Sequence, residues 1–229
     1  MQCNICGGKI FTDMPARPAV RCAGCGSLER TRLTALHIAR FITLRPDMRV
    51  LHFAPERGLA ALLRAATGPG YRALDIAPEN YPGLGVEPFD LCRDIFDLVP
   101  GSCDLIIHNH VIEHIECNYT IVLQKLTQAL TDTGTMLFTA PILKGEFTDE
   151  LVVASHEAKL ARFGSMLHVR RFGRDFVGQT LGMIYNLPER YDLCATFTPD
   201  ELRAANVPER HWDKYTGAAV FRVGRGDLR

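Results

Sequence analysis

The segment 49-RVLHFAPERGLAALLRA-65 indicates how this chain folds. Val50–Phe53 is a short apolar run typical of a buried strand, and a turn at 54–58 leads into the helical pattern of Leu59–Ala66. A strand, a loop and a helix in this order are typical of nucleotide-binding α/β proteins, whose loops usually hold three glycines. This loop has only Gly58. The segment is therefore either a modified cofactor loop or an ordinary connection.

The rest of the chain continues the alternation of strands and helices. Further strands are expected at Tyr71–Ile76, Val86–Phe89, Asp104–His108 and Thr135–Ala140, and a helix at Tyr119–Leu130. Because the main strands are almost continuously apolar, we expect a parallel sheet covered on both faces. The predicted fold is a Rossmann-like, doubly wound α/β sheet, which binds ligands at the carboxyl ends of its strands.

The pattern changes beyond Pro141. Glu146–Phe163 is polar with helical spacing, and Met183–Leu187 and Gly217–Val223 are expected to be two late strands that form a hairpin on the sheet edge.

The whole chain of 229 residues is long enough for one large domain and a small appendage. Its net charge is zero, which counts against a nucleic-acid partner bound mainly through phosphates. There is no apolar run of membrane-spanning length and no signal-peptide pattern at the N-terminus. We therefore expect a cytoplasmic protein without a membrane partner, and the oligomeric state is left open.

Four cysteines near the N-terminus have the spacing of a metal site. Two C-x2-C pairs, Cys3/Cys6 and Cys22/Cys25, are separated by fifteen residues, and a glycine follows each pair. This spacing predicts a zinc ribbon at residues 1–30 with a closed, structural zinc site. Two disulfides or a redox pair are the alternatives, which a reducing compartment disfavours.

Other features of the N-terminal region follow from this prediction. A short ribbon strand is expected at Lys9–Phe11, and Ser27 is expected to cap a helix over Ser27–Leu44 that tethers the ribbon to a main domain at 31–229. The other cysteines are expected to be core or surface thiols, namely Cys92, Cys103, Cys117 and Cys194.

Acidic residues follow the predicted strands where a nucleotide-like cofactor would need them. Asp75 ends the second strand, where a carboxylate can accept hydrogen bonds from both hydroxyls of a ribose. Asp90 and Leu91 follow the third strand, where a carboxylate and an apolar side chain suit an adenine ring, with Asp94 as a nearby substitute. Acidic residues also end strands simply as solvated turn residues, so the order of these features favours a cofactor site more than any one of them does.

These motifs together resemble a known family. The segments 105-LIIHNHVIEHI-115 and 135-TMLFTAPI-142 look like the core of class I S-adenosylmethionine-dependent methyltransferases of the type 11 kind. The segments 22-CAGCGSLERTRL-33, 51-LHFAPE-56 and 168-HVRRFGRDF-176 resemble a bacterial subgroup with a cysteine-knuckle N-terminus. The resemblance extends to about Tyr185. It implies a seven-stranded fold that binds S-adenosylmethionine, and it does not identify the methyl acceptor.

The resemblance also implies a set of cofactor-binding residues. Ala54 and Glu56 replace two glycines of the usual loop, and His52 replaces its acidic start, so Glu56 or His52 is a candidate to bind the methionine ammonium or carboxylate directly. The full predicted set is His52, Phe53, Ala54, Pro55, Glu56, Gly58, Asp75, Ile76, Asp90, Leu91, Asn109 and His110.

Two histidines are the predicted catalytic residues. His110 and His114 are four residues apart at the expected start of the helix after the fourth strand, and an imidazole is a suitable base if the acceptor must lose a proton. A structural role for His114 is the alternative. We expect no catalytic metal there, because no third ligand stands at metal spacing and Glu113 should point elsewhere on that helix.

A basic segment with interleaved aromatic residues is expected to contact the substrate or to form a lid at about 143–180. Arginine binds carboxylates and phosphates in a bidentate manner, which would suit an anionic small molecule or glycan; a solvated basic face is the alternative. The candidates are His156, Arg162, His168, Arg170, Arg171 and Arg174.

The sequence therefore predicts an S-adenosylmethionine-dependent methyltransferase with a structural Zn²⁺ ion, acting on a small molecule or glycan precursor. Two alternatives remain open at this point. One is an RNA methyltransferase that uses the ribbon and the basic segment to grip RNA. The other is a regulator that binds the cofactor without catalysis, for which the glycine-poor loop is the argument.

Overall fold

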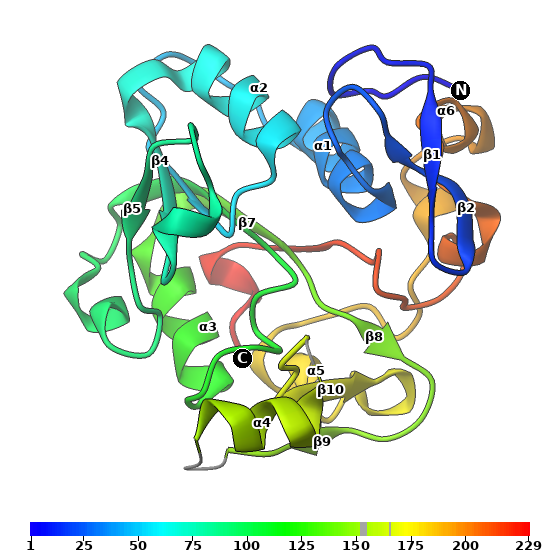
Figure 1. Cartoon of the computed structure of the whole chain (residues 1–229). Coiled ribbons are helices and arrows are strands. Elements are labelled where there is room, and N and C mark those ends of the chain that lie inside the picture. Colours follow the sequence, from blue (N-terminus) through cyan, green and yellow to red (C-terminus); the bar gives the residue numbers. More distant parts are fainter. Residues whose placement is uncertain (152–154, 165) are drawn as a thin grey trace.

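A central sheet organises the computed structural model, which describes residues 1–151, 155–164 and 166–229 (Figure 1). The strands of this sheet are β3 (Val50–Phe53), β4 (Tyr71–Asp75), β5 (Val86–Pro88), β6 (Cys103–Asn109), β7 (Leu130–Thr139) and β11 (Phe221–Val223). Their order is β11-β7-β6-β3-β4-β5, and all pairs are parallel except β11 with β7. The predicted doubly wound α/β fold is confirmed.

Helices cover the sheet on both faces. They are α1 (Glu29–Phe41), α2 (Arg57–Thr67), α3 (Tyr119–Ala129), α4 (His156–Phe163), α5 (Leu181–Ile184) and α6 (Pro199–Ala204). In Figure 1 the sheet lies between α2 and α3. Every residue of β3 is buried, and α2 buries Leu59 and Leu63 on one side, so the apolar patterns of these elements meet in one core. Short 3-10 helices complete the connections at Gly68–Gly70, Pro78–Asn80, Asp94–Asp97, Arg174–Phe176, Leu193–Ala195, Glu209–His211 and Arg225–Asp227.

Two small sheets lie outside the central one. The hairpin of β1 (Phe11–Met14) and β2 (Arg17–Cys22) lies between the two cysteine pairs, so the ribbon has two strands instead of the single strand predicted at Lys9–Phe11. The second sheet has the order β8-β10-β9 and belongs to the predicted lid segment. Its strands are β8 (Ile142–Leu143), β9 (Thr148–Asp149) and β10 (Arg170–Gly173). Residues 152–154 and 165 of that segment lie outside the described residues.

The predicted C-terminal hairpin is wrong. Only β11 joins the sheet edge, so the described sheet has six strands instead of the expected seven, and Leu181–Ile184 is a helical turn. Leu181 and Ile184, three residues apart, both point into the core, which suits a helix better than a strand. Tyr185 follows and forms only an isolated bridge with Leu228.

The segment after β6 also differs from the prediction. Residues 110–118 form irregular turns, and α3 begins only at Tyr119, where the Asn118 side chain accepts hydrogen bonds from the backbone of Thr120 and Ile121. His110 adopts a left-handed conformation with φ of 55°, which turns the chain sharply at the end of β6. His110 and His114 therefore do not share a helix face.

One helix tethers the ribbon to the rest of the chain. α1 begins at Glu29, and its N-cap residue Leu28 makes no side-chain cap, so the predicted capping role of Ser27 is wrong. Arg32 of α1 is fully buried and donates hydrogen bonds to backbone carbonyls of the ribbon and of residues 205–206. The boundary near residue 30 is therefore crossed by a buried contact, and the division into two domains stays a prediction.

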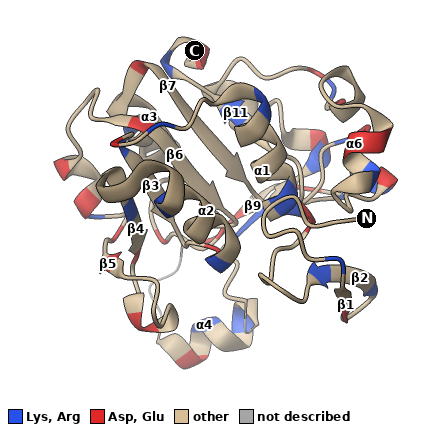
Figure 2. Cartoon of the chain, turned by 90° about the horizontal axis from the view of Figure 1, so that it is seen from above, with Lys and Arg blue, Asp and Glu red and all other residues tan. Residues whose placement is uncertain are grey.

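The surface mixes charges of both signs. Figure 2 shows acidic and basic residues on the same elements, with both signs on α4 and on α6. Within the described residues, no helix has the length and apolar character needed to cross a lipid bilayer.

Candidate functional site

A cavity of about 700 Å³ lies at the carboxyl ends of β3, β4 and β5, beside the turns that follow β6. This is the switch point of the sheet, because β3 has β4 on one side and β6 on the other. The volume is in the range of about 300–1,000 Å³ that small-molecule sites occupy. Of the predicted cofactor residues, the cavity is lined by Phe53, Ala54, Asp75, Ile76, Asp90 and Leu91.

Asp75 is held in place at the end of β4. One carboxylate oxygen accepts a hydrogen bond from the Ala77 N–H at 2.8 Å, and the other accepts one from the Tyr81 hydroxyl at 2.9 Å. Each oxygen retains a lone pair, so the carboxylate can still accept from a ligand. The neighbouring Ile76 is 70% exposed although it is large and apolar. It therefore offers the cavity an uncovered apolar surface.

Asp90 occupies the corresponding place after β5. Its carboxylate accepts from the Cys92 N–H at 2.8 Å and forms an ion pair with Arg93 at 2.9 Å. Asp94, the predicted substitute, accepts instead from the backbone N–H of Asp90 and so supports this turn. Leu91 is buried beside it. This end of the cavity thus combines a carboxylate with apolar side chains.

The loop after β3 is built around Glu56. The carboxylate of Glu56 receives hydrogen bonds from Thr31 of α1 at 3.1 Å and from Asn109 of β6 at 3.1 Å, and it lies 3.1 Å from Nε2 of His52. Burial alone would raise the pKa of Glu56, but the bonds from His52 and Thr31 and the charge of Arg30 lower it. An ionised carboxylate therefore occupies the place of a loop glycine.

The side chain of His52 has no exposed surface and contacts the Glu56 carboxylate. Its Nδ1 lies 3.0 Å from the Tyr71 hydroxyl, and its Nε2 faces Glu56. Neither His52 nor Glu56, Pro55, Gly58, Asn109 or His110 is among the residues that line the cavity. His52 and Glu56 therefore belong to a buried polar cluster beside the cavity and not to its lining.

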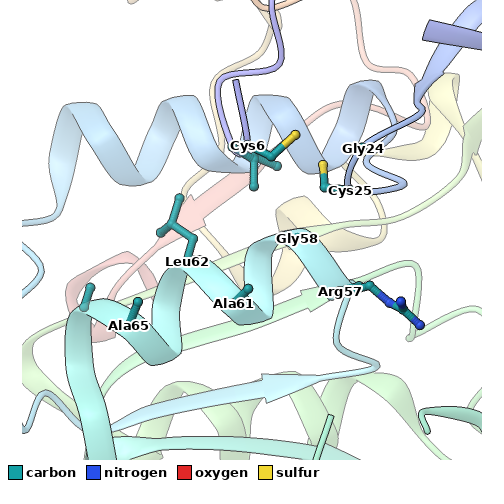
Figure 3. A pocket seen from close by; sticks show the side chains of 10 residues that line it. Cys6, Gly24, Cys25, Arg57, Gly58, Ala61, Leu62 and Ala65 are labelled. Carbon is teal, nitrogen blue, oxygen red and sulfur yellow. The ribbon is translucent and has the colours of Figure 1, made fainter. Parts of the chain in front are cut away.

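Gly58 is required by packing against the ribbon. A Cβ atom added at Gly58 would lie 2.9 Å from Cβ and 3.0 Å from Sγ of Cys25, closer than real Cβ contacts allow. Figure 3 shows this approach, where α2 faces Cys6 and Cys25 across a hollow of about 590 Å³ that Leu62 and Ala61 also line. The glycine predicted to contact the cofactor thus contacts the cysteine centre.

Ala54 occupies a loop position whose backbone conformation favours glycine. Its φ of 48° is left-handed, a conformation that costs a residue with a Cβ about 1–2 kcal/mol. We expect Ala54→Gly to raise the free energy of unfolding by about 0.5–1 kcal/mol, since the greater freedom of glycine in the unfolded chain offsets part of the gain. Urea denaturation measures this change. The matched control is Ala65→Gly on the exposed face of α2, which should lower stability by about 1 kcal/mol. Equal losses in both variants would contradict the strain argument.

The predicted catalytic histidines have different surroundings. His114 lines the cavity, and burial lowers the pKa of its imidazole to about 4. His110 is anchored away from the cavity surface, because its Nε2 lies 2.7 Å from the carbonyl oxygen of Gly217. Burial, together with the charge of Arg30, lowers the pKa of His110 to about 3. Both rings are therefore neutral near pH 7.

Two charged residues near this site were not predicted. Arg30 of α1 has a buried Nε without a hydrogen-bond partner among the described residues, and its charge lowers the pKa of Glu56, of His110 and of Glu113. Glu113 is fully buried, and burial raises the pKa of its carboxyl to about 8. Only the tertiary structure brings Arg30 to this place, because it belongs to a helix that precedes the whole sheet.

Arg170 was predicted to contact the substrate, and its environment argues against this. It is fully buried, forms an ion pair with Asp149 at 2.8 Å, and donates to the carbonyls of Ile112, Ile115 and Cys117. These carbonyls belong to the irregular turns after β6, which have few backbone partners of their own. Arg170 therefore holds the turns in place and offers no surface to a substrate.

The other predicted substrate residues are dispersed. Arg174 donates to the Tyr215 carbonyl at 2.7 Å, Arg171 donates to the Lys144 carbonyl at 2.9 Å, and Arg162 pairs with Glu150. His156 is exposed at the start of α4. The structure brings only His168 of this group to the cavity region, where its ring lies 4.7 Å from that of His114.

The four N-terminal cysteines converge as predicted. The Sγ atoms of Cys3 and Cys25 are 3.6 Å apart, those of Cys6 and Cys22 are 3.5 Å apart, and all four are free thiols within 4.8 Å of one another. Zn–S bonds of about 2.3 Å place tetrahedral sulfurs about 3.8 Å apart, so the sulfurs fit a zinc ion. None of the four cysteines forms a disulfide in this structure.

The turns around the sulfurs are matched to this role. Each C-x2-C pair is followed by a left-handed glycine, Gly7 or Gly26, both with φ of 76°. The Ser27 hydroxyl lies 3.3 Å from the sulfurs of Cys3 and Cys25. Burial opposes ionisation of Cys3, but hydrogen bonds from Ser27 and from nearby backbone groups lower its pKa to about 6. Ser27 therefore favours the thiolate of Cys3 instead of capping α1.

The remaining cysteines are only partly as predicted. Cys103 is a buried thiol and Cys194 an exposed one, whereas Cys92 and Cys117 form a disulfide with a Cα–Cα distance of 5.7 Å. The prediction of free thiols is wrong for this pair. Cys92 follows Asp90 and Cys117 precedes α3, so their proximity depends on the packing of the cavity walls.

Solved structures of other proteins resemble this chain at the level of the fold. No protein-family model matches the chain, and no curated protein sequence matches it. A solved S-adenosylmethionine-dependent methyltransferase from Archaeoglobus fulgidus shares 13% identity over 84% of this chain and 90% of its own, with a TM-score of 0.47.

Two further solved structures match shorter parts. A putative sarcosine dimethylglycine methyltransferase from Galdieria sulphuraria shares 22% identity over 57% of this chain and 50% of its own, with a TM-score of 0.39. The second is phosphoethanolamine N-methyltransferase 2 from Haemonchus contortus in complex with phosphomonomethylethanolamine and S-adenosylhomocysteine. It shares 14% sequence identity with this chain over 64% of this chain and 35% of its own, with a TM-score of 0.40. This chain thus spans half the length of the first and about a third of the second.

Proposed function

We propose that the chain is an S-adenosylmethionine-dependent methyltransferase that acts on a small-molecule acceptor. The observation that carries the proposal is the joint placement of Asp75 and Asp90, which end neighbouring parallel strands and line one cavity at the switch point of the sheet. A cofactor with a ribose and an adenine matches this pair of carboxylates and the apolar side chains between them.

Residues of the cavity and of the polar cluster beside it would divide the binding of the cofactor between them. Asp75 would accept hydrogen bonds from the ribose hydroxyls, and Asp90 would accept from the adenine amino group beside Leu91. Glu56 and Arg30 carry opposite charges close enough for Arg30 to lower the pKa of Glu56. They suit the ammonium and the carboxylate of the methionine end, while His52 keeps Glu56 in position.

When bound, the cofactor supplies an activated methyl group on its sulfonium. Holding the acceptor in line with this group can contribute about 7–11 kcal/mol to the lowering of the barrier, so the chain needs few reacting side chains. His114 is the residue we propose for accepting a proton from the acceptor, because it lines the cavity and is neutral near pH 7. Its low pKa makes it a weak base, which suits an acceptor that loses its proton easily.

The test is the binding of S-adenosylhomocysteine, measured by titration calorimetry. Asp75→Asn keeps the shape of the side chain and removes its charge, so we expect the Kd to rise by about 10- to 150-fold, the equivalent of a charged hydrogen bond worth about 1.5–3 kcal/mol. Asp97→Ala is the matched control, because Asp97 is exposed and does not line the cavity.

The outcomes separate the hypotheses. If the wild-type chain does not bind S-adenosylhomocysteine, the proposed function is wrong. If the chain binds it with the expected effect of Asp75→Asn but transfers no methyl group to any of a panel of small acceptors, a cofactor-binding regulator is the better description.

We also propose that the four cysteines hold a structural zinc ion. The site has four sulfur donors and therefore no open position for a substrate, so its role is to fix the ribbon against α1 and α2. Its test is described in the Discussion.

A further inference from the structure

A buried carboxylate stands beside the cavity without the partners it needs. Glu113 has no exposed surface, and neither of its side-chain oxygens has a hydrogen-bond partner among the described residues. Burying a carboxyl group without a partner costs several kcal/mol, so a native structure that contains one calls for an explanation.

Two histidines face this carboxylate. Nε2 of His114 lies 3.8 Å from Oε1 of Glu113, and the Nε2 atom of His168 is buried and also lacks a hydrogen-bond partner among the described residues. One donor atom from each of the three residues lies within 4.8 Å of the other two. His110 is outside this group of three, although its Nδ1 is 3.6 Å from the same oxygen.

We propose that Glu113, His114 and His168 bind a divalent transition-metal ion. Two imidazoles and a carboxylate are typical ligands of zinc, iron or manganese, whereas magnesium and calcium prefer oxygen ligands alone. Two donors at tetrahedral positions about 2.0–2.1 Å from zinc are about 3.3 Å apart, so the 3.8 Å between Nε2 of His114 and Oε1 of Glu113 would have to shorten by about 0.5 Å when the ion binds. One bound cation would be coordinated by the carboxylate and by both imidazoles.

The fold brings the third ligand from a distant part of the sequence. The backbone N–H of Arg170 donates to the carbonyl of Glu113 at 3.1 Å, and the Arg170 guanidinium binds the carbonyls of Ile112 and Cys117. These bonds hold His168 against the turns after β6. His168 is a candidate third ligand that spacing along the chain did not reveal, and the lack of a helix at 110–118 removes the reason for expecting Glu113 to point elsewhere.

The site would also have an open position toward the cavity. His114 lines the cavity, and three protein ligands leave at least one coordination position for an oxygen or nitrogen of a bound molecule. This arrangement differs from that of the cysteine centre, which is closed. The inference concerns cation binding and does not require methyl transfer. Because the ion would occupy Nε2 of His114, this imidazole could serve as the proposed base only in the metal-free chain.

The experiment is a Co²⁺ titration of the full chain with zinc retained in the cysteine centre, followed by visible absorption and equilibrium dialysis. We expect one further equivalent of Co²⁺ to bind without a sulfur-to-metal charge-transfer band, and excess Mg²⁺ should not displace it. Glu113→Gln and His168→Asn should each weaken this binding at least 10-fold. His156→Asn should not change it, because His156 is exposed on α4.

Each outcome bears on the proposal. Co²⁺ binding with a thiolate band, no binding beyond the cysteine centre, or equal binding by the wild type and both variants would overturn it. Thermal denaturation of each variant shows that it is folded. Since the titration contains no S-adenosylhomocysteine, failure to bind the metal is separate from failure to bind the cofactor product.

Discussion

Replacing Cys22 with serine is expected to release the zinc ion that we propose for the cysteine centre and to lower the free energy of unfolding by more than about 4 kcal/mol. Cys22 is 1% exposed, and its sulfur is one of four that converge within 4.8 Å. Loss of a structural metal is among the few single changes with an effect this large. For a chain of this size the expected fall in Tm is about 8–16 °C.

Two measurements check this result. Elemental mass spectrometry of the purified wild type should find zinc that the Cys22→Ser variant lacks, and a thermal scan gives the change in Tm. Cys194→Ser is the control, because Cys194 is an exposed thiol outside the cluster and its replacement should change neither quantity. A wild-type chain without bound metal, whose Tm is insensitive to Cys22→Ser, would show that the sulfurs converge for another reason.

Replacing Arg32 with methionine should be almost as damaging, with an expected loss of about 3–5 kcal/mol. Arg32 is fully buried, and its guanidinium donates to the carbonyls of Val20, Ser27, Ala205 and Asn206 at 2.8–3.0 Å. Methionine fills much of the volume but leaves these carbonyls without donors, and each buried unpaired group costs about 1–3 kcal/mol. Relaxation and water entry should keep the total below the full sum.

Chemical denaturation of Arg32→Met measures the loss, and Arg21→Met on the exposed face of β2 is the matched control. Arg32→Lys keeps the charge but reaches fewer carbonyls, so an intermediate loss is expected. If Arg32→Met and Arg21→Met are equally stable, the buried guanidinium does not join the ribbon to the C-terminal segment.

The parts of the fold that could be predicted depend on local patterns. β3, β4 and β6 are short apolar runs, and the cysteine pairs carry their own turn glycines, so a few neighbouring residues specify each element. Asp75 and Asp90 could be placed in one cavity because parallel strands end on the same edge of a sheet. That inference needs only the order of the strands.

Other parts depend on contacts that the sequence does not encode locally. Arg170 is a residue type that often binds anionic substrates. Here its guanidinium is buried and donates hydrogen bonds to carbonyls of the turns after β6, so its role is structural. The disulfide between Cys92 and Cys117 and the approach of Arg30 to Glu56 likewise join segments from different elements. Spacing along the chain carries no information about such pairs.

The loop 52-HFAPERG-58 shows the division most directly. The sequence by itself determined that a strand, a turn and a helix occur there, because apolar residues are spaced differently in a strand and in a helix. Only the tertiary structure decided why its residues are these. Gly58 admits the sulfur of Cys25, and Glu56 joins α1, β3 and β6 through hydrogen bonds from Thr31, His52 and Asn109. Close packing and buried hydrogen bonds each join residues that are far apart in the sequence. Only the folded chain therefore shows which residues are paired.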